Sequence, residues 1–159
     1  MDMTIERVPW ADPDAEGLRA AQRFELDARY GSDDHEPGVV PSADDVPVFL
    51  IARDRDGRAL VCGGLRPLAA DVLGADVAEI KRMYAAPSAR GTGAAAALLR
   101  ALEGEARVLG IRRLVLETGT AQPDAVRFYQ REGYVSIPLF GHYVDSELSL
   151  CFAKRLDAA

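Results

Sequence analysis

The stretch SARGTGAAAALL, from Ser88 to Leu99, is the segment on which the expected fold depends. Its core GTGAAA fits G-x-G-x-x-G/A, the fingerprint of a dinucleotide-binding turn, and Glu117 stands downstream, where that fingerprint wants an acid. Such a turn joins strand to helix tightly near the start of a doubly wound sheet. Here the segment Ala85 to Arg90, which contains a proline, separates the preceding strand from Gly91, and three expected strands come earlier. A nicotinamide-binding turn is therefore disfavoured.

The same glycine turn has another physical use. Gly91 and Gly93 carry no side chain, so an anion can approach the backbone, where the first N–H groups of the following helix point outward. Arg90 adds a positive charge, and hydrogen bonds to charged acceptors are the stronger ones. A P-loop is excluded because the stretch lacks a Gly-Lys-Ser/Thr ending. The turn is therefore either a cradle for phosphate groups that is formed mainly by the backbone or simply a tight turn before a helix, which the two glycines alone would favour.

The segments around the turn alternate between strand and helix patterns. Short apolar runs predict strands at 4–8, 46–52, 59–68, 76–84 and 111–117, and YVSIPLFGHY (134–143) and LSLCFAKRL (148–156) close the sheet. Apolar residues at helical spacing predict helices at 13–30, 93–109 and 123–132. The helix at 93–109 makes a parallel crossover, whereas DRDG at 54–57 turns an antiparallel hairpin. A single α/β (α+β) domain over residues 1–159 is expected.

The helix expected at 13–30 is less clearly amphipathic than the one at 93–109. Leu18, Ala21, Phe24, Glu25 and Ala28 give it only a fair apolar stripe. The acidic, Pro- and Gly-broken segment 31–45 that follows reads as a loop and is a candidate lid or substrate wall.

Composition narrows the class of partner. The 159 residues carry a net charge of −6, which disfavours nucleic acid and anionic membranes and mildly favours a cationic substrate. No signal peptide or membrane span is recognised, so a cytoplasmic location is expected. Cys62 and Cys151 lie in apolar runs outside any CxxC pair and are expected to be buried thiols. With only His35 and His142 besides, no metal site is expected.

Two motifs together resemble the GCN5-related N-acetyltransferase (GNAT) family. The family's acetyl-CoA loop has the form R/Q-x-x-G-x-G/A, and Arg90, Gly93 and Ala95 stand at those three positions after the strand EIKRMYA. A second segment, Ala125-x-x-x-Tyr129 followed by Glu132-Gly133-Tyr134, looks like the family's A-x-x-x-Y…G-F/Y element. The resemblance implies a single GNAT-like domain with a central mixed, mostly antiparallel sheet flanked by helices. It also implies a splayed parallel strand pair that forms the acyl-CoA cleft.

The resemblance assigns the cofactor contacts residue by residue. It implies that acetyl-CoA is the co-substrate and that backbone groups of the strand before the loop pair with the pantetheine arm. The implied cofactor-binding residues are Met83, Tyr84, Ala85, Arg90, Gly91, Thr92, Gly93, Ala94, Ala95 and Gln122. Gln122 stands where many members have asparagine, so the hydrogen bond expected there is altered. No metal is implied.

Two residues are candidates for the chemistry. An ammonium must lose a proton before it attacks a thioester, and Glu79, on the strand expected to carry the acetyl group, is the preferred base. A structural ion pair with Lys81 or Arg82, on the same strand, explains Glu79 equally well. Tyr129 resembles the residue that protonates the leaving thiolate, although packing alone would also explain an aromatic residue at that spacing. The backbone N–H of Met83 is a candidate oxyanion donor.

The acceptor is less well specified than the donor. Polar and aromatic residues that might face the cleft are Tyr30, Arg66, Lys81, Arg82, Glu117, His142 and Tyr143. Acidic residues at 33–36 and 44–45 favour polyamines, whereas Arg66 and Arg82 would suit an amino-acid-like carboxylate, and a protein amine remains open. The expected function is acetyl transfer to a primary amine in a ternary complex. The alternative is a CoA-binding sensor with little turnover. A homodimer is possible, with 148–156 as an added edge.

Overall fold

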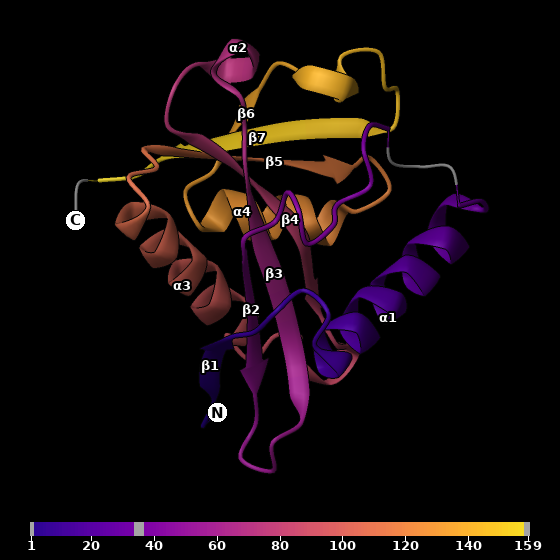
Figure 1. Cartoon of the computed structure of the whole chain (residues 1–159). Helices are drawn as coiled ribbons and strands as arrows, with labels where there is room; N and C mark the ends of the chain where they lie inside the picture. The colour runs from indigo at the N-terminus through magenta and orange to yellow at the C-terminus, as the bar shows by residue number, and fades with distance from the viewer. Residues whose placement is uncertain (1, 34–36, 158–159) are drawn as a thin grey trace.

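A seven-stranded sheet forms the centre of the computed structural model, which describes residues 2–33 and 37–157 (Figure 1). Its strands are β1 (Thr4–Arg7), β2 (Val48–Arg53), β3 (Ala59–Pro67), β4 (Val77–Ala85), β5 (Arg113–Gly119), β6 (Val135–Ile137) and β7 (Ser149–Arg155). They lie in the order β1-β2-β3-β4-β5-β7-β6. The helices are α1 (Pro13–Tyr30), α2 (Ala70–Leu73), α3 (Ala94–Val108) and α4 (Pro123–Arg131). The expected mixed, mostly antiparallel sheet is confirmed.

The only parallel neighbours among the described strands, β4 and β5, are paired over a short length. Their register runs from Val77 opposite Arg113 to Glu79 opposite Val115. Beyond that point β4 continues to Ala85 and β5 to Gly119, while both stay paired to their other neighbours, β3 and β7. In Figure 1 the strands β2 to β4 run lengthwise, and β5 and β7 lie across their upper part. The expected splayed pair is therefore present.

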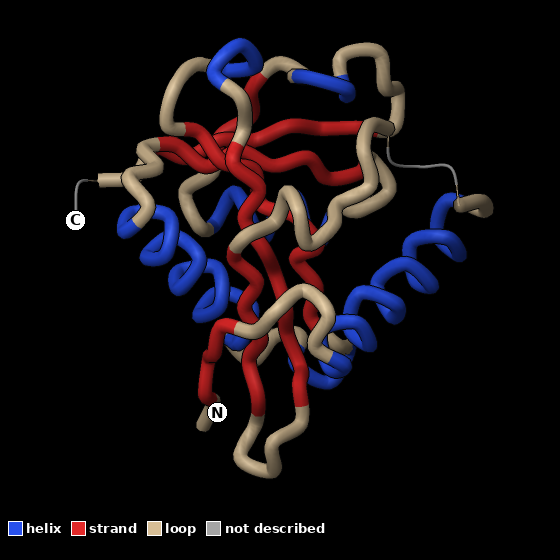
Figure 2. The backbone as a smooth tube through the Cα atoms, in the orientation of Figure 1, coloured by secondary structure: helices blue, strands red, loops and turns tan. Residues whose placement is uncertain are grey.

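The core divides between the two faces of the sheet, as the alternation along β2 shows. Val48 and Leu50 belong to a cluster with Leu98 and Leu102 of α3. Phe49 belongs to a second cluster, which includes Ala15 and Leu18 of α1. Because successive strand residues point to opposite faces, α1 and α3 cover opposite sides of the sheet (Figure 2). The gap in the middle of the sheet, where β4 and β5 part, is therefore reached by helices from both sides.

Three sequence expectations need correction. Only Val135–Ile137 of the segment 134–143 is strand, and Gly141–Tyr143 forms a 3-10 turn instead. Pro138 has no N–H to give to a ladder, and Gly141 has a φ of 53°, so the strand cannot continue. The short helix α2 lies in a segment left unassigned. Strand β7 is not an edge, because it lies between β5 and β6.

The inner face of α1 also differs from the expected stripe. Phe24 is 80% exposed, so it does not belong to the buried face. That face is formed by Ala15, Leu18 and Arg19, and it continues toward the C-terminal end of the helix as Gln22 and Leu26, which line a cavity described below. The helix packs on the core with its first half and covers a hollow with its second. No helix in the described ranges is long and apolar enough to cross a membrane.

Candidate active site

Two cavities open where β4 and β5 diverge. The small cavity, of about 90 Å³, is walled by Ile80 to Met83 of β4 and Glu117 to Gly119 of β5. The large cavity, of about 380 Å³, extends along β4 to Ala85 and to Arg90 and Gly91 of the glycine loop. Six residues line both cavities: Gln22, Leu26, Met83, Gln122, Ala125 and Tyr129. The two cavities therefore meet between α1, β4 and α4.

The glycine loop lies at one end of the large cavity and has the backbone shape that its glycines allow. Gly91 and Gly93 have φ values of 77° and 87°, and a side chain added to either would meet no heavy atom within 4 Å. The N–H of Ala94 donates to the Thr92 hydroxyl at 3.3 Å, so this first helical donor already has a partner. Arg90, Gly91 and Ala95 line the cavity, whereas Thr92, Gly93 and Ala94 are not among the residues lining it.

Arg90 is held in place from two directions. Its Nε donates to the carbonyl of Ala85 at 3.0 Å, and its Nη2 donates to Glu25 Oε2 of α1 at 2.7 Å. The hydrogen bond from Arg90 lowers the pKa of Glu25 below its ordinary value, against the opposing effect of partial burial. The same ion pair raises the pKa of Arg90. The expected phosphate-binding cation is thus engaged by a carboxylate of the opposite helix.

Arginines gather around the large cavity. Its charged lining residues are Arg29, Arg90, Arg127 and Arg131, with Glu25 and Asp124 as the acids. Arg29 lies 3.5 Å from Glu25, and Arg127 pairs with Asp124. Four guanidinium groups against two carboxylates leave this cavity cationic, although the chain carries a net charge of −6. Such a cluster suits phosphate groups, which planar guanidinium donors bind well.

Three carbonyls of β4 already accept hydrogen bonds from side chains, one of them, that of Arg82, from the Cys62 thiol at 3.3 Å. Gln22 Nε2 donates to Met83 O at 2.9 Å, and Arg90 takes the carbonyl of Ala85. Arg82 precedes Met83 on β4 and has a φ of 57°. The register of the β3–β4 pair shifts close to this residue. A non-glycine residue in that region costs energy and marks a bulge in the strand. The bulge gives β4 a local bend beside the point where the two cavities meet.

Tyr129 lies at the junction of the cavities. It is buried, lines both of them, and packs edge-on against Phe128 and Tyr134 with ring centroids 5.1 Å and 5.7 Å away. Burial raises the pKa of its phenol well above the ordinary value. The phenol therefore keeps its proton over the whole physiological range and is available as a donor to an anion formed in the junction.

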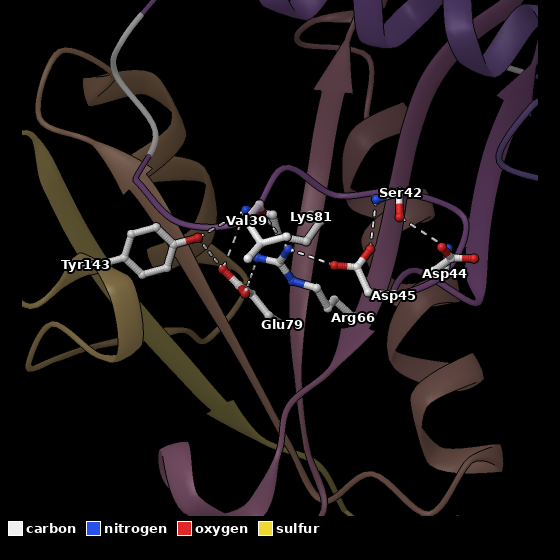
Figure 3. A network of polar contacts seen from close by, with 8 residues as sticks. All are labelled: Val39, Ser42, Asp44, Asp45, Arg66, Glu79, Lys81 and Tyr143. Atoms are coloured by element: carbon white, nitrogen blue, oxygen red, sulfur yellow. Dashed lines mark hydrogen bonds and ion pairs between the residues drawn. The ribbon is translucent and has the colours of Figure 1, made fainter.

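Glu79 lies in a buried polar network that Figure 3 shows. It is 2% exposed, and it accepts from Arg66 at 3.1 Å and from the Tyr143 hydroxyl at 2.6 Å. Lys81 Nζ donates to the same hydroxyl at 3.0 Å and lies 3.7 Å from Glu79 Oε2. Arg66 also donates to Asp45 at 3.1 Å and to the carbonyl of Val39 at 3.1 Å. The network therefore ties the segment after residue 36 to the sheet.

Lys81 connects this network to the cavities. Among the described residues, Lys81 rather than Glu79 lines the small cavity. Of the other acceptor candidates, Tyr30, Arg82 and Glu117 also line it. Arg66 and Tyr143 lie in the buried network instead, and His142 packs near Gly38. The acidic run expected at 33–36 falls largely outside the described residues.

The residues that sequence reasoning missed come mostly from α1. Gln22, Glu25 and Leu26 line the cavities, as do Arg127 and Arg131 of α4. Nothing in the spacing of these polar residues distinguishes them from ordinary solvent-facing positions.

The cysteines lie as expected: Cys62 and Cys151 are buried, and burial raises their pKa to about 12 and about 11. Within residues 2–33 and 37–157 no group of three or more His, Cys, Asp or Glu side chains forms a metal site.

The comparisons with known proteins agree with this geometry. The model of the acetyltransferase (GNAT) family matches residues 10–134. The chain belongs to the GNAT acetyltransferase family. This GNAT chain is 39% identical to the IAA acetyltransferase of Azospirillum brasilense over 108 residues, which are 68% of the chain and 67% of that protein. The chain is accordingly an acyltransferase, and its glycine loop belongs to an acetyltransferase and not to a dinucleotide fold.

Solved GNAT structures agree over nearly the whole chain. The crystal structure of a candidate acyl-CoA N-acyltransferase from Klebsiella pneumoniae is 32% identical, with a TM-score of 0.78 over 98% of both chains. A GNAT acetyltransferase from Elizabethkingia anophelis with acetyl-CoA bound has a TM-score of 0.68 at 16% identity, covering 97% of this chain and 98% of that one. At that identity the likeness establishes the fold alone. The GNAT fold uses acetyl-CoA as its co-substrate.

Proposed function

We propose that this GNAT acetyltransferase moves the acetyl group of acetyl-CoA to a primary amine by direct attack within a ternary complex. The observation that carries the proposal is the junction of the two cavities at Tyr129, Gln22 and Met83. The large cavity, with its four arginines, suits the phosphates and pantetheine arm of the donor. The small cavity then holds the acceptor beside the thioester, so no acyl-enzyme intermediate is needed.

The proposed roles follow the positions in the cleft. Arg90, Gly91, Thr92, Gly93, Ala94 and Ala95 hold the phosphates, and Met83, Tyr84, Ala85 and Gln122 contact the pantetheine arm. Because Gln22 and Arg90 already occupy the carbonyls of Met83 and Ala85, the arm must share or displace those hydrogen bonds. Tyr129 donates to the departing thiolate, and because burial raises the pKa of its phenol, the phenol still carries its proton when the thiolate forms.

For the base we propose that Glu79 acts through Lys81 and Tyr143. The proton lost by the acceptor ammonium passes to Lys81 as Lys81 gives a proton to the Tyr143 hydroxyl and Tyr143 gives its own to Glu79. The existing hydrogen bonds from Lys81 to Tyr143 and from Tyr143 to Glu79 run in this direction. The chain of donors would allow the buried carboxylate to serve a cavity that it does not line.

The size and lining of the small cavity favour a small acceptor. About 90 Å³ is far below the roughly 300–1,000 Å³ of sites for drug-sized ligands. Lys81 and Arg82 contribute positive charge and Glu117 negative charge, so a small amine or an amino-acid-like molecule fits better than a long polyamine.

The test is thiol release from acetyl-CoA with a panel of acceptors. The panel contains α-amino acids, short monoamines, polyamines, a lysine peptide and IAA, the compound in the name of the Azospirillum relative. Amine-dependent thiol release, highest with the small amines, is expected. Tight acetyl-CoA binding in calorimetry without thiol release above the rate in water would contradict the proposal and favour a CoA-binding sensor.

A further inference from the structure

Gln22 occupies an unusual position in the cleft. It lies on the inner face of α1 and lines both cavities at their junction. Its Nε2 donates to the carbonyl of Met83 at 2.9 Å. Because a carbonyl can only accept, the amide nitrogen must face Met83, and the orientation of the side chain is settled by this contact. Gln22 Oε1 therefore points away from β4.

This oxygen is buried and has no hydrogen-bond partner among the described residues. A buried acceptor without a donor costs about 1–3 kcal/mol, so such groups in proteins call for an explanation. Arg19, the other buried residue with an unpaired polar atom, lies under Trp10 and Phe49 and is not among the cavity-lining residues. Of the two, only Gln22 is among the residues that line the cavities.

The surroundings of this oxygen indicate what it lacks. Of the other residues that line both cavities, Leu26, Met83 and Ala125 carry no side-chain donor, and neither Gln122 nor Tyr129, which do, donates to this oxygen. A neutral primary amine that attacks a thioester has two N–H bonds and one lone pair. An oxygen that accepts one of those N–H bonds turns the lone pair toward the carbonyl carbon, and it neither gives nor takes a proton itself.

We propose that Gln22 binds the acceptor amine, with Oε1 accepting an N–H of the attacking nitrogen. This inference rests on the proposed function and adds the residue that orients the nucleophile. In the step itself the nitrogen lone pair forms the C–N bond, and the C–S bond breaks with its electron pair on sulfur. The ammonium's first proton passes to the base before attack. The thiolate takes the phenol proton of Tyr129, and the proton that the nitrogen then loses restores the Tyr129 phenol. The pantetheine arm then shares the carbonyl of Met83 with Gln22, whose hydrogen bond holds the amide in position.

The inference can be tested without knowing the acceptor. Two acetyl-CoA analogues that differ in a single group serve as probes. S-carbamoylmethyl-CoA (CoA–S–CH2–CO–NH2) ends in an amide NH2, and S-acetonyl-CoA (CoA–S–CH2–CO–CH3) ends in a methyl group instead. The NH2 stands close to the place of the attacking nitrogen. We expect the wild-type protein to bind S-carbamoylmethyl-CoA about tenfold more tightly in calorimetry, the worth of one satisfied buried acceptor.

In Gln22→Met this preference should fall to within about twofold, since methionine fills similar space and offers only a weak sulfur acceptor. The affinity for S-acetonyl-CoA should stay unchanged. Gln130→Met, the same exchange at an exposed position of α4, should keep the full preference. Gln22→Leu is a second variant in case Gln22→Met does not fold, and it should also lose the preference because leucine offers no acceptor.

A full preference in Gln22→Met would overturn the inference. An equal loss of affinity for both compounds would also overturn it, because Gln22 would then hold the pantetheine arm. Thiol release by the wild-type protein decides the proposed function separately. If the wild-type protein acetylates an amine but Gln22→Met keeps the full preference for S-carbamoylmethyl-CoA, only the role of Gln22 is rejected. If no acetyl transfer is found, the proposed function is rejected, and the binding comparison still decides whether Gln22 binds an N–H group.

Discussion

Arg90 and Glu25 are joined across the mouth of the large cavity by a hydrogen-bonded ion pair of 2.7 Å. The first belongs to the glycine loop and the second to α1, 65 residues away in sequence. A phosphate group that enters this cavity therefore meets a cation whose charge is already partly neutralised. Glu25 weakens the site for an anion, because like charges at short range repel each other.

Removing that carboxylate should strengthen donor binding. In Glu25→Gln the side chain keeps its size and loses its charge, so we expect the Kd of acetyl-CoA to fall about fivefold in calorimetry. Glu16→Gln makes the same charge change in the exposed first turn of α1 and should leave the Kd within twofold. Weaker binding in Glu25→Gln would contradict the prediction and would mean that Glu25 positions Arg90 for the phosphate.

The same pair predicts a pH dependence of stability. The hydrogen bond from Arg90 lowers the folded-state pKa of Glu25 below its ordinary value of 4.5. A carboxyl group with a lowered folded-state pKa stabilises the protein above its unfolded-state pKa, and this contribution disappears as the pH falls through the folded-state value. The wild-type protein should therefore unfold at higher urea concentration than Glu25→Gln at pH 7, and the difference should shrink below pH 4.5. A difference that stays constant down to pH 3 would refute the assignment.

Gly93 should be sensitive to any side chain. Its φ of 87° is unfavourable for other residues, although no atom would clash with an added Cβ. Gly93→Ala should lower the free energy of unfolding by about 1 kcal/mol. It should also raise the Kd of acetyl-CoA, because the strained residue would shift the backbone of the loop that we propose holds the phosphates. Gly104, inside α3 and equally free of clashes, provides the matched exchange. Gly104→Ala should raise stability by about 0.5–1 kcal/mol and leave donor binding unchanged.

Tyr129 and Tyr134 should differ in function although both are buried tyrosines. Tyr129→Phe should lower kcat about 10- to 100-fold with little change in the Kd of acetyl-CoA, since only the departing thiolate needs the phenol proton. Tyr134 donates to Glu103 at 2.9 Å on the α3 side, so Tyr134→Phe should lower stability and leave kcat near the wild-type value. Equal losses of kcat in Tyr129→Phe and Tyr134→Phe would contradict a proton-donor role for Tyr129 and would indicate that its ring only packs in the core.

The raised pKa of Tyr129 carries a second expectation for the same assay. Because burial keeps the phenol protonated, the kcat profile should show no loss of activity from tyrosine ionisation up to pH 10. A fall in kcat between pH 8 and pH 10 that disappears in Tyr129→Phe would contradict this.

The buried network around Glu79 should matter for folding as well as for proton transfer. Glu79→Gln leaves Arg66, 14% exposed, and Lys81, 6% exposed, without their main counter-charge. Removing one partner of a buried ion pair costs about 3–5 kcal/mol, and we expect a loss at the lower end in urea unfolding. Arg100→Gln breaks a pair whose arginine is 68% exposed, so its loss should stay below about 1 kcal/mol. Similar losses in both variants would contradict this account.

Sequence patterns predicted those helices and strands whose apolar residues keep one periodicity along the whole element. The helix α3 has apolar residues on one face and a glycine stop, and its crossover from β4 to β5 followed from the order of elements. The segment 134–143 failed because a run of apolar residues looks like a strand even where Pro138 and a positive φ at Gly141 prevent pairing. The amino-acid composition of a segment does not show at which residue its hydrogen bonding to the neighbouring strand ends.

The candidate site was predicted only where it depends on a motif. Arg90, Gly91 and Tyr129 line the cavity, as expected from the loop and the A-x-x-x-Y segment. The contribution of α1 was missed because Gln22 and Glu25 are polar residues in a helix, which solvent explains equally well. Only the tertiary position of α1 over the divergence of β4 and β5 turns that polar face toward a ligand.

If acetyl-CoA binds in the large cavity, as we propose, its four arginines affect how quickly the donor arrives as well as how tightly it stays. The chain carries a net charge of −6, which repels a polyanion, whereas the cationic lining of this cavity attracts it. Fields focused in this way speed association and lose their effect as salt rises. The association rate of acetyl-CoA should therefore fall steeply as the ionic strength rises, whereas the association rate of an uncharged acceptor should not change. The salt concentration of the medium then determines which of the two substrates limits turnover.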